Sequence, residues 1–249
     1  MLRLAVPSEG ALHESSLLFL QSCGIAVQRS DVRRYTADIP ALPGVKVHFQ
    51  RASDIALKVE EQSAEMGIVG RDQYIETQRD DGNSHTVINN LGFGHSELVV
   101  GVPDAWIDVS SMADLVDLSI EFRERGWALR IATKYPRLVE RFLLNSGVSY
   151  FSLVPASGTL EAAPAMGYAD IIADISSTGT TLKKNQLKTV ISGSIISSTA
   201  CLISNRALLG NSAEKLRLAT GLVERIAAHL SGSEESTAVM RLTGEESGA

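Results

Sequence analysis

The chain has 249 residues, of which 44% are hydrophobic and 21% are charged, and its formal net charge at pH 7 is -6. This composition is typical of a soluble globular protein with one large or two modest domains, and the acidic balance argues against a nucleic-acid-binding surface. No apolar run reaches the roughly 18 residues of a membrane span, and the N-terminus lacks the basic and apolar regions of a secretory signal. We therefore expect a cytoplasmic protein without a membrane or nucleic-acid partner.

Cysteine and histidine usage gives no sign of disulfides or of a metal site built by the protein alone. Cys23 and Cys201 are isolated in apolar surroundings, which is typical of reduced core residues, and the five histidines show no ligand spacing. An anionic substrate would therefore have to be attracted by local positive charge or by a metal ion.

The first stretch predicts a strand, a polar loop and a helix. Residues 2–6 are an apolar run that Pro7 ends, and residues 12–22 have the apolar spacing of a helix, which Gly24 ends. Because a strand and a helix follow each other from residue 2 on, the pattern favours the α/β class. The loop between them consists of Ser8, Glu9, Gly10 and Ala11.

A hairpin-like region leads to His48, Asp54 is expected to cap the next helix, and residues 66–69 read as a strand. Arg71 and Asp72 follow at the carboxyl end of that strand. Ligands of open α/β sheets bind outside the carboxyl ends of the strands, so both residues are candidates for a binding site. Capping of a following helix is an equally good explanation of Asp72.

A polar loop at 80–84 precedes further alternation of strands and helices. Pro103 ends the last strand of the first half. The alternation predicts strands at 86–91, 97–102, 129–133 and 150–154, and helices at 112–118 and 136–146.

Residues 169–175 form a short apolar run with two aspartates, Asp170 and Asp174, and predict a buried strand. Small hydroxyl residues and one glycine follow, before a helix near Leu182. Such a loop offers backbone N–H groups without bulk, which suits a phosphate, although a capped turn between strand and helix favours the same residues. The loop consists of Ser176, Ser177, Thr178, Gly179, Thr180 and Thr181.

Residues 213–230 have the apolar stripe of an amphipathic helix. The stripe could form a subunit contact or pack on the helix's own domain, and both remain open from the sequence. The last stretch, 231–249, is rich in Ser, Gly and Glu around the apolar residues 238–242, and we expect it to be partly disordered.

The stretch from residue 161 to 182 carries the most specific pattern of the chain, with matches at Glu161, Gly167, Tyr168, Ala169, Ile172, Ala173, Asp174, Ile175, Thr178, Gly179, Thr180, Thr181 and Leu182. It resembles the signature of the ATP phosphoribosyltransferase catalytic subunit, which opens histidine biosynthesis. Supporting stretches lie at 66–72, 91–94, 130–136 and 198–203, so the resemblance covers about residues 1–205. The chain is too short for the C-terminal regulatory domain of the long members and is similar to the short form.

The resemblance implies an α/β chain with a two-lobe fold like that of type II periplasmic binding proteins, with the active site in the cleft between the lobes. Lobe I would comprise residues 1–103 and 191–231, and lobe II residues 104–190 with the phosphate-binding loop. Residues 232–249 would form a partly disordered tail. Alternating strands and helices alone would fit many doubly wound folds.

The reaction implied by the resemblance transfers the phosphoribosyl group of phosphoribosyl pyrophosphate to N1 of ATP, with Mg²⁺ on the released pyrophosphate. The 174–181 loop would hold the ribose 5-phosphate, and Asp174 would face the ribose hydroxyls. Glu161 could reach ribose or metal, although capping of a helix at Ala162 explains it as well. Further possible contacts to substrate or metal are Arg51, Arg71, Asp72, Arg130, Lys134 and Asp170.

The resemblance also implies an assembly. Family members form homodimers or larger oligomers, and short-form members work with a separate regulatory subunit that resembles histidyl-tRNA synthetase. We therefore expect a homo-oligomer and such a partner.

The first loop departs from the family pattern, because Glu9 stands where a lysine is usual and Ala11 where an arginine is usual. Glu97 likewise replaces an arginine, and the basic residue usual beside Asp54 is missing. Near polyanionic ligands these changes cannot be neutral. They leave two alternatives to the ATP enzyme: a phosphoribosyltransferase with another nitrogen acceptor, and a non-catalytic two-lobe binding or regulatory protein.

Overall fold

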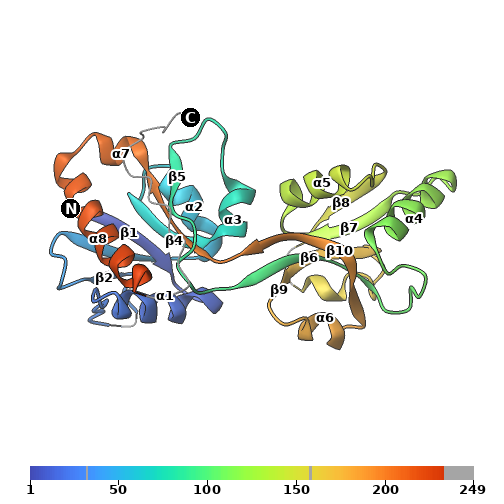
Figure 1. Ribbon diagram of the computed structural model, residues 1–249, viewed down its shortest axis with the longest axis horizontal. Helices are drawn as coiled ribbons and strands as arrows, with labels where there is room; N and C mark the ends of the chain where they lie inside the picture. Colours follow the sequence, from blue (N-terminus) through green and yellow to red (C-terminus); the bar gives the residue numbers. More distant parts are fainter. Residues whose placement is uncertain (32, 157–158, 233–249) are drawn as a thin grey trace. The chain divides into compact units, whose positions relative to one another are not determined.

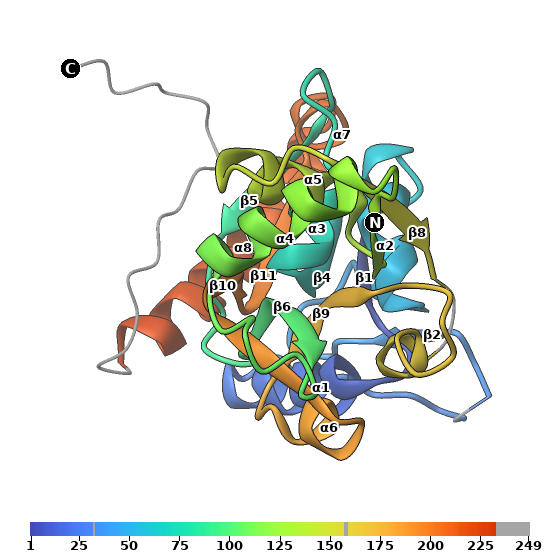
Figure 2. The same cartoon turned by 90° about the vertical axis from the view of Figure 1, so that its right-hand side faces the viewer.

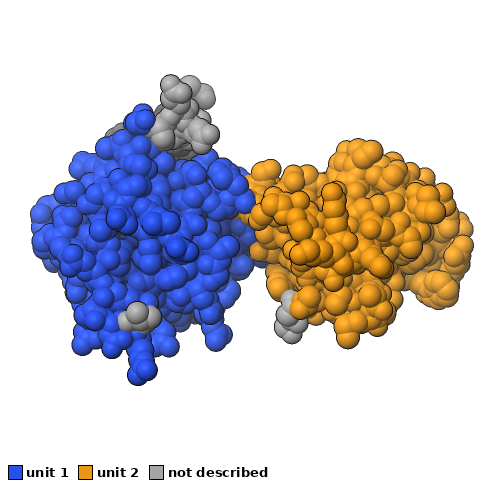
Figure 3. Space-filling view, turned by 90° about the horizontal axis from the view of Figure 1, so that it is seen from below, with its two compact units in different colours: residues 1–95, 199–249 blue, residues 96–198 orange. Residues whose placement is uncertain are grey.

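The structure is a computed structural model that describes residues 1–31, 33–156 and 159–232. The chain forms two compact α/β units, Met1–His95 with Thr199–Ala249, and Ser96–Ser198 (Figures 1 and 3). From residue 233 on, the expected tail lies outside the described residues. Each unit is described by itself below.

The first unit has one six-stranded sheet in the order β2-β3-β1-β4-β11-β5. β1 runs parallel to β3 and β4, whereas β11 is antiparallel to β4 and β5, and β2 is antiparallel to β3. The strand that returns from the second unit is thus inserted between two strands of the first. The strands are β1 Leu2–Pro7, β2 Thr36–Asp38, β3 Val45–Gln50, β4 Met66–Gly70, β5 Ser84–Ile88 and β11 Ala200–Asn205.

Helices cover both faces of this sheet, and strand periodicity decides which side chains meet which helices. Leu4 and Leu202 belong to the core cluster that contains residues of α1 and α8, whereas their chain neighbours Ala5 and Ile203 belong to the cluster that contains residues of α2 and α3. Successive strand residues point to opposite faces, so both faces are apolar and both are buried. The helices are α1 Ala11–Ser22, α2 Ala52–Glu60, α3 Arg71–Thr77, α7 Arg206–Gly210 and α8 Ala213–Ser231.

The start of α2 differs from the sequence expectation. The helix begins at Ala52 with Arg51 as its N-cap residue, and no side chain caps it. The Asp54 carboxylate, predicted as the cap, accepts a hydrogen bond from the Ser53 hydroxyl inside the first turn instead (2.8 Å). Arg51 therefore stands directly between the end of β3 and the helix.

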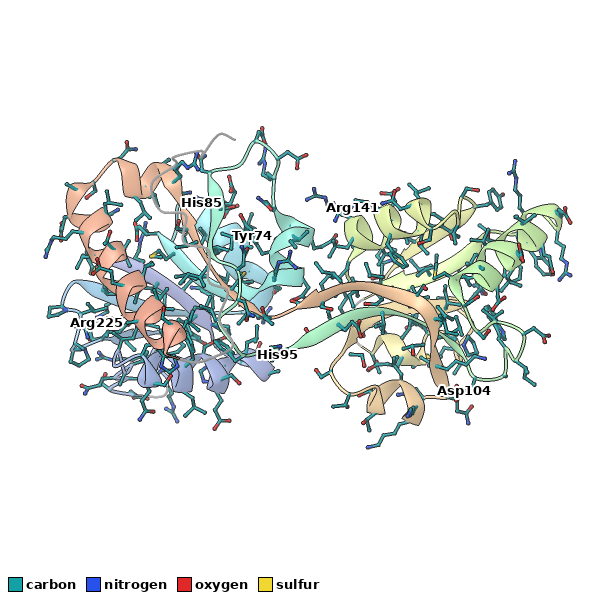
Figure 4. All side chains as sticks on the ribbon, viewed as in Figure 1. Tyr74, His85, His95, Asp104, Arg141 and Arg225 are labelled. Carbon is teal, nitrogen blue, oxygen red and sulfur yellow. The ribbon has the colours of Figure 1, made fainter. Side chains whose placement is uncertain are left out.

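The apolar stripe of α8 is buried within the first unit. Leu222, Val223 and Ile226 are fully buried and belong to the cluster that packs on the sheet, whereas Arg225 lies on the exposed face (Figure 4). Of the two explanations that the sequence left open, packing on the helix's own unit is correct. The stripe is not available for a subunit contact.

Gly67 of β4 allows α2 to approach the sheet closely. A Cβ at Gly67 would lie 2.6 Å from the Ile55 methyl group Cγ2 and 3.1 Å from that of Val59. We expect Gly67→Ala to destabilise the protein by about 1–3 kcal/mol, because the added methyl group overpacks a buried contact. Urea unfolding followed by circular dichroism measures this change.

Gly221→Ala is the matched control, because Gly221 lies within α8 and a Cβ there would meet only Leu42 at 3.9 Å. Alanine in an uncrowded helix interior should stabilise the protein by roughly 0.5–1 kcal/mol. If Gly67→Ala is as stable as the natural protein, α2 does not pack on β4 as described.

The second unit has a five-stranded sheet in the order β10-β6-β9-β7-β8. β6 is antiparallel to both β10 and β9, and β7 is parallel to β9 and β8. Because β6 and β10 pair with each other and belong to this sheet, residues 96–103 and 191–198 lie in the second unit. The sequence had assigned both stretches to lobe I, which corresponds to the first unit. The strands are β6 Ser96–Pro103, β7 Leu129–Thr133, β8 Phe151–Pro155, β9 Ile171–Ser176 and β10 Leu187–Ser198.

In the second unit, α4 Met112–Glu124 and α5 Pro136–Asn145 lie on one face of the sheet, and η1 Leu160–Ala162 and α6 Thr180–Lys184 on the other (Figures 1 and 2). α4 is six residues longer than expected. A capping box between Ser111 and Asp114 fixes its start, and no breaker follows before Gly126, which has φ +76°.

Candidate functional site

The loop between β9 and α6 has a defined backbone conformation. Gly179 adopts the left-handed conformation with φ +70° and ψ -3°, and its N–H donates to Ser176 Oγ (2.9 Å). The Thr178 hydroxyl donates to the Thr180 hydroxyl (2.9 Å). A residue with a side chain adopts this backbone conformation only with strain, so the glycine allows the turn.

Several backbone donors of this loop have no protein acceptor. Among the described residues, none accepts a hydrogen bond from the N–H groups of Ser177, Thr178 or Thr181, and all three residues are exposed. Apart from its chain neighbours, no atom of the described residues lies within 4 Å of the position that a Cβ on Gly179 would take. The loop therefore offers exposed, unpaired N–H groups beside open space, which suits the binding of an anion by the backbone.

The helix contributes less to this site than the sequence suggested. α6 spans only the 5 residues from Thr180 to Lys184. A single helical turn sums few peptide dipoles, so the individual N–H groups of the loop, rather than a helix macrodipole, provide most of the positive potential.

Asp174 lies at the carboxyl end of β9, close to Lys134 and Glu161. Burial raises the pKa of Asp174, and the charge of Glu161 acts in the same direction, whereas the Ile175 N–H (2.8 Å to Oδ1) and the charge of Lys134 lower it. Lys134 follows the last residue of β7, and β7 and β9 are parallel neighbours. Glu161 lies in η1, where no side-chain cap is formed, so the capping role considered for it is not found. Asp174 thus has one positive and one negative charge close to it at the end of β9.

Arg130 and Asp170, also candidates, lie at the opposite end of the same strands. The Arg130 guanidinium binds the Asp170 carboxylate in a bidentate pair, with Nη2 2.7 Å from Oδ1 and Nε 3.2 Å from Oδ2. Arg130 Nη1 also donates to the Gly167 carbonyl (2.8 Å). Arg130 and Lys134 are four positions apart along the chain, a rise of about 13 Å. The structure thus does not bring Arg130 and Asp170 to the loop. Their contacts connect β7 to the segment before β9 and indicate a structural role.

Glu97 lies beside the loop, on β6, which is the strand between β9 and β10. It is opposite Ser176 of β9 and Ser197 of β10, and its carboxylate accepts a hydrogen bond from the Ser194 hydroxyl. In the sequence this position was noted only as a departure from the family pattern. Strand pairing thus places the negative charge of Glu97 next to Ser176, whose hydroxyl accepts the hydrogen bond from the Gly179 N–H.

In the first unit, the other candidates share one edge of the sheet. β1 and β3 end together at Pro7 and Gln50, and Ser8 N–H donates to the Gln50 carbonyl (2.7 Å). The parallel register of β1 and β4 brings the end of β4 to the same edge. The residues gathered there are Ser8, Glu9, Gly10, Ala11, Arg51, Arg71 and Asp72.

Glu9, Ala11 and Arg51 are exposed at this edge, whereas Asp72 is buried. Gly70, not Asp72, is the N-cap residue of α3, and no side chain caps the helix. A Cβ on Gly70 would lie 2.6 Å from Asp72 Oδ1, so the carboxylate turns back over the end of β4. In each unit, the candidate loops lie at the sheet edge where the chain enters or leaves that unit, between residues 95 and 96 and between residues 198 and 199.

His13, which lies in the first turns of α1, was not among the residues that the sequence indicated. Its Nδ1 is 2.6 Å from the Pro7 carbonyl oxygen, so the imidazole closes the first loop against the end of β1. A polar aromatic residue three positions after the glycine that starts the helix was the available signal.

Neither unit contains a protein-built metal site among its described residues, because no group of three or more His, Cys, Asp or Glu side chains is suitably placed. No helix in the described part of the chain is long and apolar enough to span a membrane. Cys23 and Cys201 are buried and free, as the sequence predicted.

Comparison with known proteins identifies relatives for most of the chain. The family model described as ATP phosphoribosyltransferase matches residues 51–237. A protein of Mesorhizobium japonicum named ATP phosphoribosyltransferase is 41% identical over 209 residues, which cover 83% of this chain and 90% of that protein. The protein of the same name from Chelativorans sp. is 43% identical over 203 residues, with 80% and 88% coverage.

Solved structures share the fold. The ATP phosphoribosyl transferase (HisG:HisZ) complex from Thermotoga maritima contains a chain that matches with a TM-score of 0.67 at 22% identity, covering 94% of this chain and all of that one. The alkanesulfonate-binding protein SsuA from Xanthomonas axonopodis matches with a TM-score of 0.53 at 16% identity, with 93% and 74% coverage. The predicted periplasmic-binding-protein-like fold is thus confirmed.

Proposed function

The chain belongs to the ATP phosphoribosyltransferase family, and on that basis we propose how its residues transfer the phosphoribosyl group of phosphoribosyl pyrophosphate to N1 of ATP. This transfer releases pyrophosphate and is the first step of histidine biosynthesis. The observation that supports the assignment most directly is the 174–181 loop, with its unpaired N–H groups and left-handed Gly179 at the end of β9.

The loop binds the ribose 5-phosphate in this proposal. The N–H groups of Ser177, Thr178 and Thr181 donate to phosphate oxygens, and the open space at Gly179 admits the phosphate close to the backbone. Asp174 accepts hydrogen bonds from the ribose hydroxyls, while Lys134 balances its charge. Charge-assisted hydrogen bonds of this kind fix the ribose in one orientation.

The chemistry then needs position and charge rather than a covalent intermediate. The N1 lone pair of adenine forms the new bond to C1 of the ribose, and the bond from C1 to the pyrophosphate oxygen breaks, so that pyrophosphate leaves with that electron pair. The ribose is cation-like at the transition state, and the neighbouring carboxylates of Asp174 and Glu161 stabilise it.

The edge of the first unit supplies cationic groups for the polyphosphate chains. Arg51, exposed at the end of β3, and Arg71, at the end of β4, bind triphosphate or pyrophosphate oxygens. The opposite charge of Glu9 on the same edge limits how much anion this edge can hold.

The metal-ligating side chains of the chain fit a magnesium ion that arrives with the substrate rather than one that is permanently bound. No group of three or more ligating side chains exists among the described residues, and Mg²⁺ is usually held through substrate phosphates with one or two carboxylates. Asp174 and Glu161 are the carboxylates that would hold it. When bound, the ion supplies charge that stabilises the leaving pyrophosphate.

We further propose that the chain acts in the cytoplasm as a homo-oligomer with a histidyl-tRNA-synthetase-like regulatory subunit. The similarity to a chain of the HisG:HisZ complex supports this assembly. The buried stripe of α8 does not support it, so the contact must use other surfaces.

Pyrophosphate release in the presence of both substrates tests the proposed function. We expect release that requires phosphoribosyl pyrophosphate and ATP together with Mg²⁺, measured with the chain alone and with the regulatory subunit from the same organism. Release with another nitrogen nucleophile but not with ATP would mean that this other compound, and not ATP, is the acceptor. Calorimetry that finds no phosphoribosyl pyrophosphate binding would leave only a non-catalytic role.

The altered first loop gives a prediction about ATP binding. Glu9→Lys with Ala11→Arg raises the local charge by about 3 units, so we expect ATP to bind several-fold more tightly, with a steeper loss of affinity in salt. Calorimetric titration with ATP at low and physiological salt measures this.

The control carries the same charge change far from this edge. Glu224→Lys with Ala228→Arg alters exposed positions on the outer face of α8. It should leave the ATP dissociation constant nearly unchanged. Equal dissociation constants for all three proteins would mean that the first loop faces away from the nucleotide.

A further inference from the structure

We propose that His13 reads the adenine base: its Nε2 atom accepts a hydrogen bond from the exocyclic 6-amino group of ATP. This inference rests on the proposed function and concerns how the enzyme selects its nucleotide. It assigns a specificity-determining role to a histidine outside the phosphate-binding elements.

The hydrogen bond at the other ring nitrogen determines the tautomer of the neutral His13 imidazole. Nδ1 is 2.6 Å from the Pro7 carbonyl oxygen. A carbonyl oxygen only accepts hydrogen bonds, so Nδ1 carries the proton. In the neutral imidazole, Nε2 therefore has a lone pair and acts as an acceptor.

The imidazole ring is held in one orientation by its neighbours. It packs edge-on against Phe49, with ring centroids 5.8 Å apart and an interplanar angle of 69°. The Arg29 guanidinium lies over the same phenyl ring, 4.3 Å from its centroid. The main chain of His13 is also fixed, because its N–H donates to the Gly10 carbonyl (3.1 Å). An acceptor fixed in this way loses little entropy when a ligand binds.

Nε2 remains available to a ligand. No described residue forms a hydrogen bond with it, and it is not among the buried side-chain nitrogens that lack a partner, so it reaches solvent. His13 closes the same loop that lies next to Arg51, since β1 and β3 end side by side. A nucleotide whose phosphates reach the arginines would place its base near this edge.

The chemistry of this edge explains why an acceptor matters. Arg51 and Arg71 are donors only, and donors alone cannot favour the 6-amino group of adenine over the 6-oxo group of hypoxanthine or guanine. Nε2 accepts from the amino group and repels the lone pairs of an oxo group. Because the amino group is bonded to the carbon next to N1, the same hydrogen bond also orients the reacting nitrogen.

Calorimetric titration of the full chain with ATP, inosine triphosphate and purine riboside triphosphate, all at pH 8, tests this inference. These nucleotides carry an amino group, an oxo group and a hydrogen atom at position 6. Inosine also carries a proton on N1, so the purine riboside analogue is the one that isolates the amino group. We expect the natural protein to prefer ATP over both analogues by about tenfold or more, the scale of a specific hydrogen bond at a binding site. His13→Ala should reduce this preference to within about threefold.

Two further variants separate recognition from folding. His13→Asn keeps an N–H group able to donate to the Pro7 carbonyl but has no atom at the position of Nε2, so it should remain folded and lose the preference as His13→Ala does. His229→Ala removes a histidine that contacts Ser22 at the end of α1, and should retain the full preference for ATP.

An unchanged ratio of dissociation constants in both His13 variants would overturn the inference, while leaving the proposed function intact. If Glu9→Gln loses the preference for ATP and His13→Asn keeps it, Glu9 rather than His13 recognises the base, and the inference is overturned as well. If the natural protein binds phosphoribosyl pyrophosphate but no nucleotide, the proposed acceptor and this inference both fail.

Discussion

Gly179→Val should lower the affinity for phosphoribosyl pyrophosphate by about 100-fold while the protein remains folded. Gly179 has φ +70°, and in the described part of the chain no neighbouring atom occupies the space where a Cβ would project. A β-branched residue would either keep this conformation, with a side chain in the space that the phosphate needs, or change it and scatter the N–H groups. Either outcome weakens the same site. Calorimetric titration with phosphoribosyl pyrophosphate measures it.

Gly167→Val is a closely matched control. Gly167 lies in the same unit, has φ +74° and is likewise surrounded by open space. The backbone strain of the two variants should therefore be similar, about 1–2 kcal/mol. Only Gly179→Val should lose the ligand. A similar affinity loss in both variants would mean that strain, rather than occupied phosphate space, explains the effect, and the loop would no longer be the phosphate site.

Local sequence predicted much of the fold because local rules determine most of these elements. The apolar run 129–133 became β7 with the same bounds, and the stripe at 213–230 became α8 with one residue more. The polar loops after β1 and β4 lie at one edge of their sheet, as expected, because the carboxyl ends of parallel strands share an edge. The loop after β9 lies at the corresponding edge of the other sheet.

The errors concern long-range strand pairing. The bidentate contact of Arg130 with Asp170 spans 40 residues and depends on the register of β7 and β9, which no local pattern shows. The positions of the two connections between the units likewise depend on the pairing of β6 with β10. His13 was missed because only the folded turn brings its imidazole to the Pro7 carbonyl.

Loss of the Glu65 carboxylate should strongly destabilise the first unit. Its side chain is fully buried, and its carboxylate accepts hydrogen bonds from Arg3 Nε (3.0 Å), Arg3 Nη2 (2.7 Å) and Lys215 Nζ (2.8 Å). The Arg3 backbone N–H adds a fourth (2.7 Å). The carboxylate thereby connects β1, the turn before β4 and α8, at the sheet end opposite the candidate site.

These contacts determine how stability depends on pH. Burial alone would raise the pKa of Glu65, but the hydrogen bonds from Arg3 and Lys215 outweigh it and lower the pKa from 4.5 to about 2. Because the folded pKa lies below the unfolded one, this stabilisation is present above about pH 4.5 and is lost as the pH falls toward 2. Its size is about 3 kcal/mol.

Glu65→Gln should therefore cost about 3–5 kcal/mol at neutral pH, because two partly buried cationic groups lose the charge of their fully buried partner. For a chain of this size, the melting temperature Tm should fall by roughly 6–15 °C. The variant should also lose less stability than the natural protein between pH 4.5 and 2, since it has no carboxylate to protonate. Glu214→Gln, which removes an exposed ion pair with the N-terminus, should change Tm little. If Glu65→Gln melts like the Glu214 variant and keeps the acid dependence of the natural protein, the buried carboxylate does not hold β1 to α8, and another group must produce the acid sensitivity of this unit.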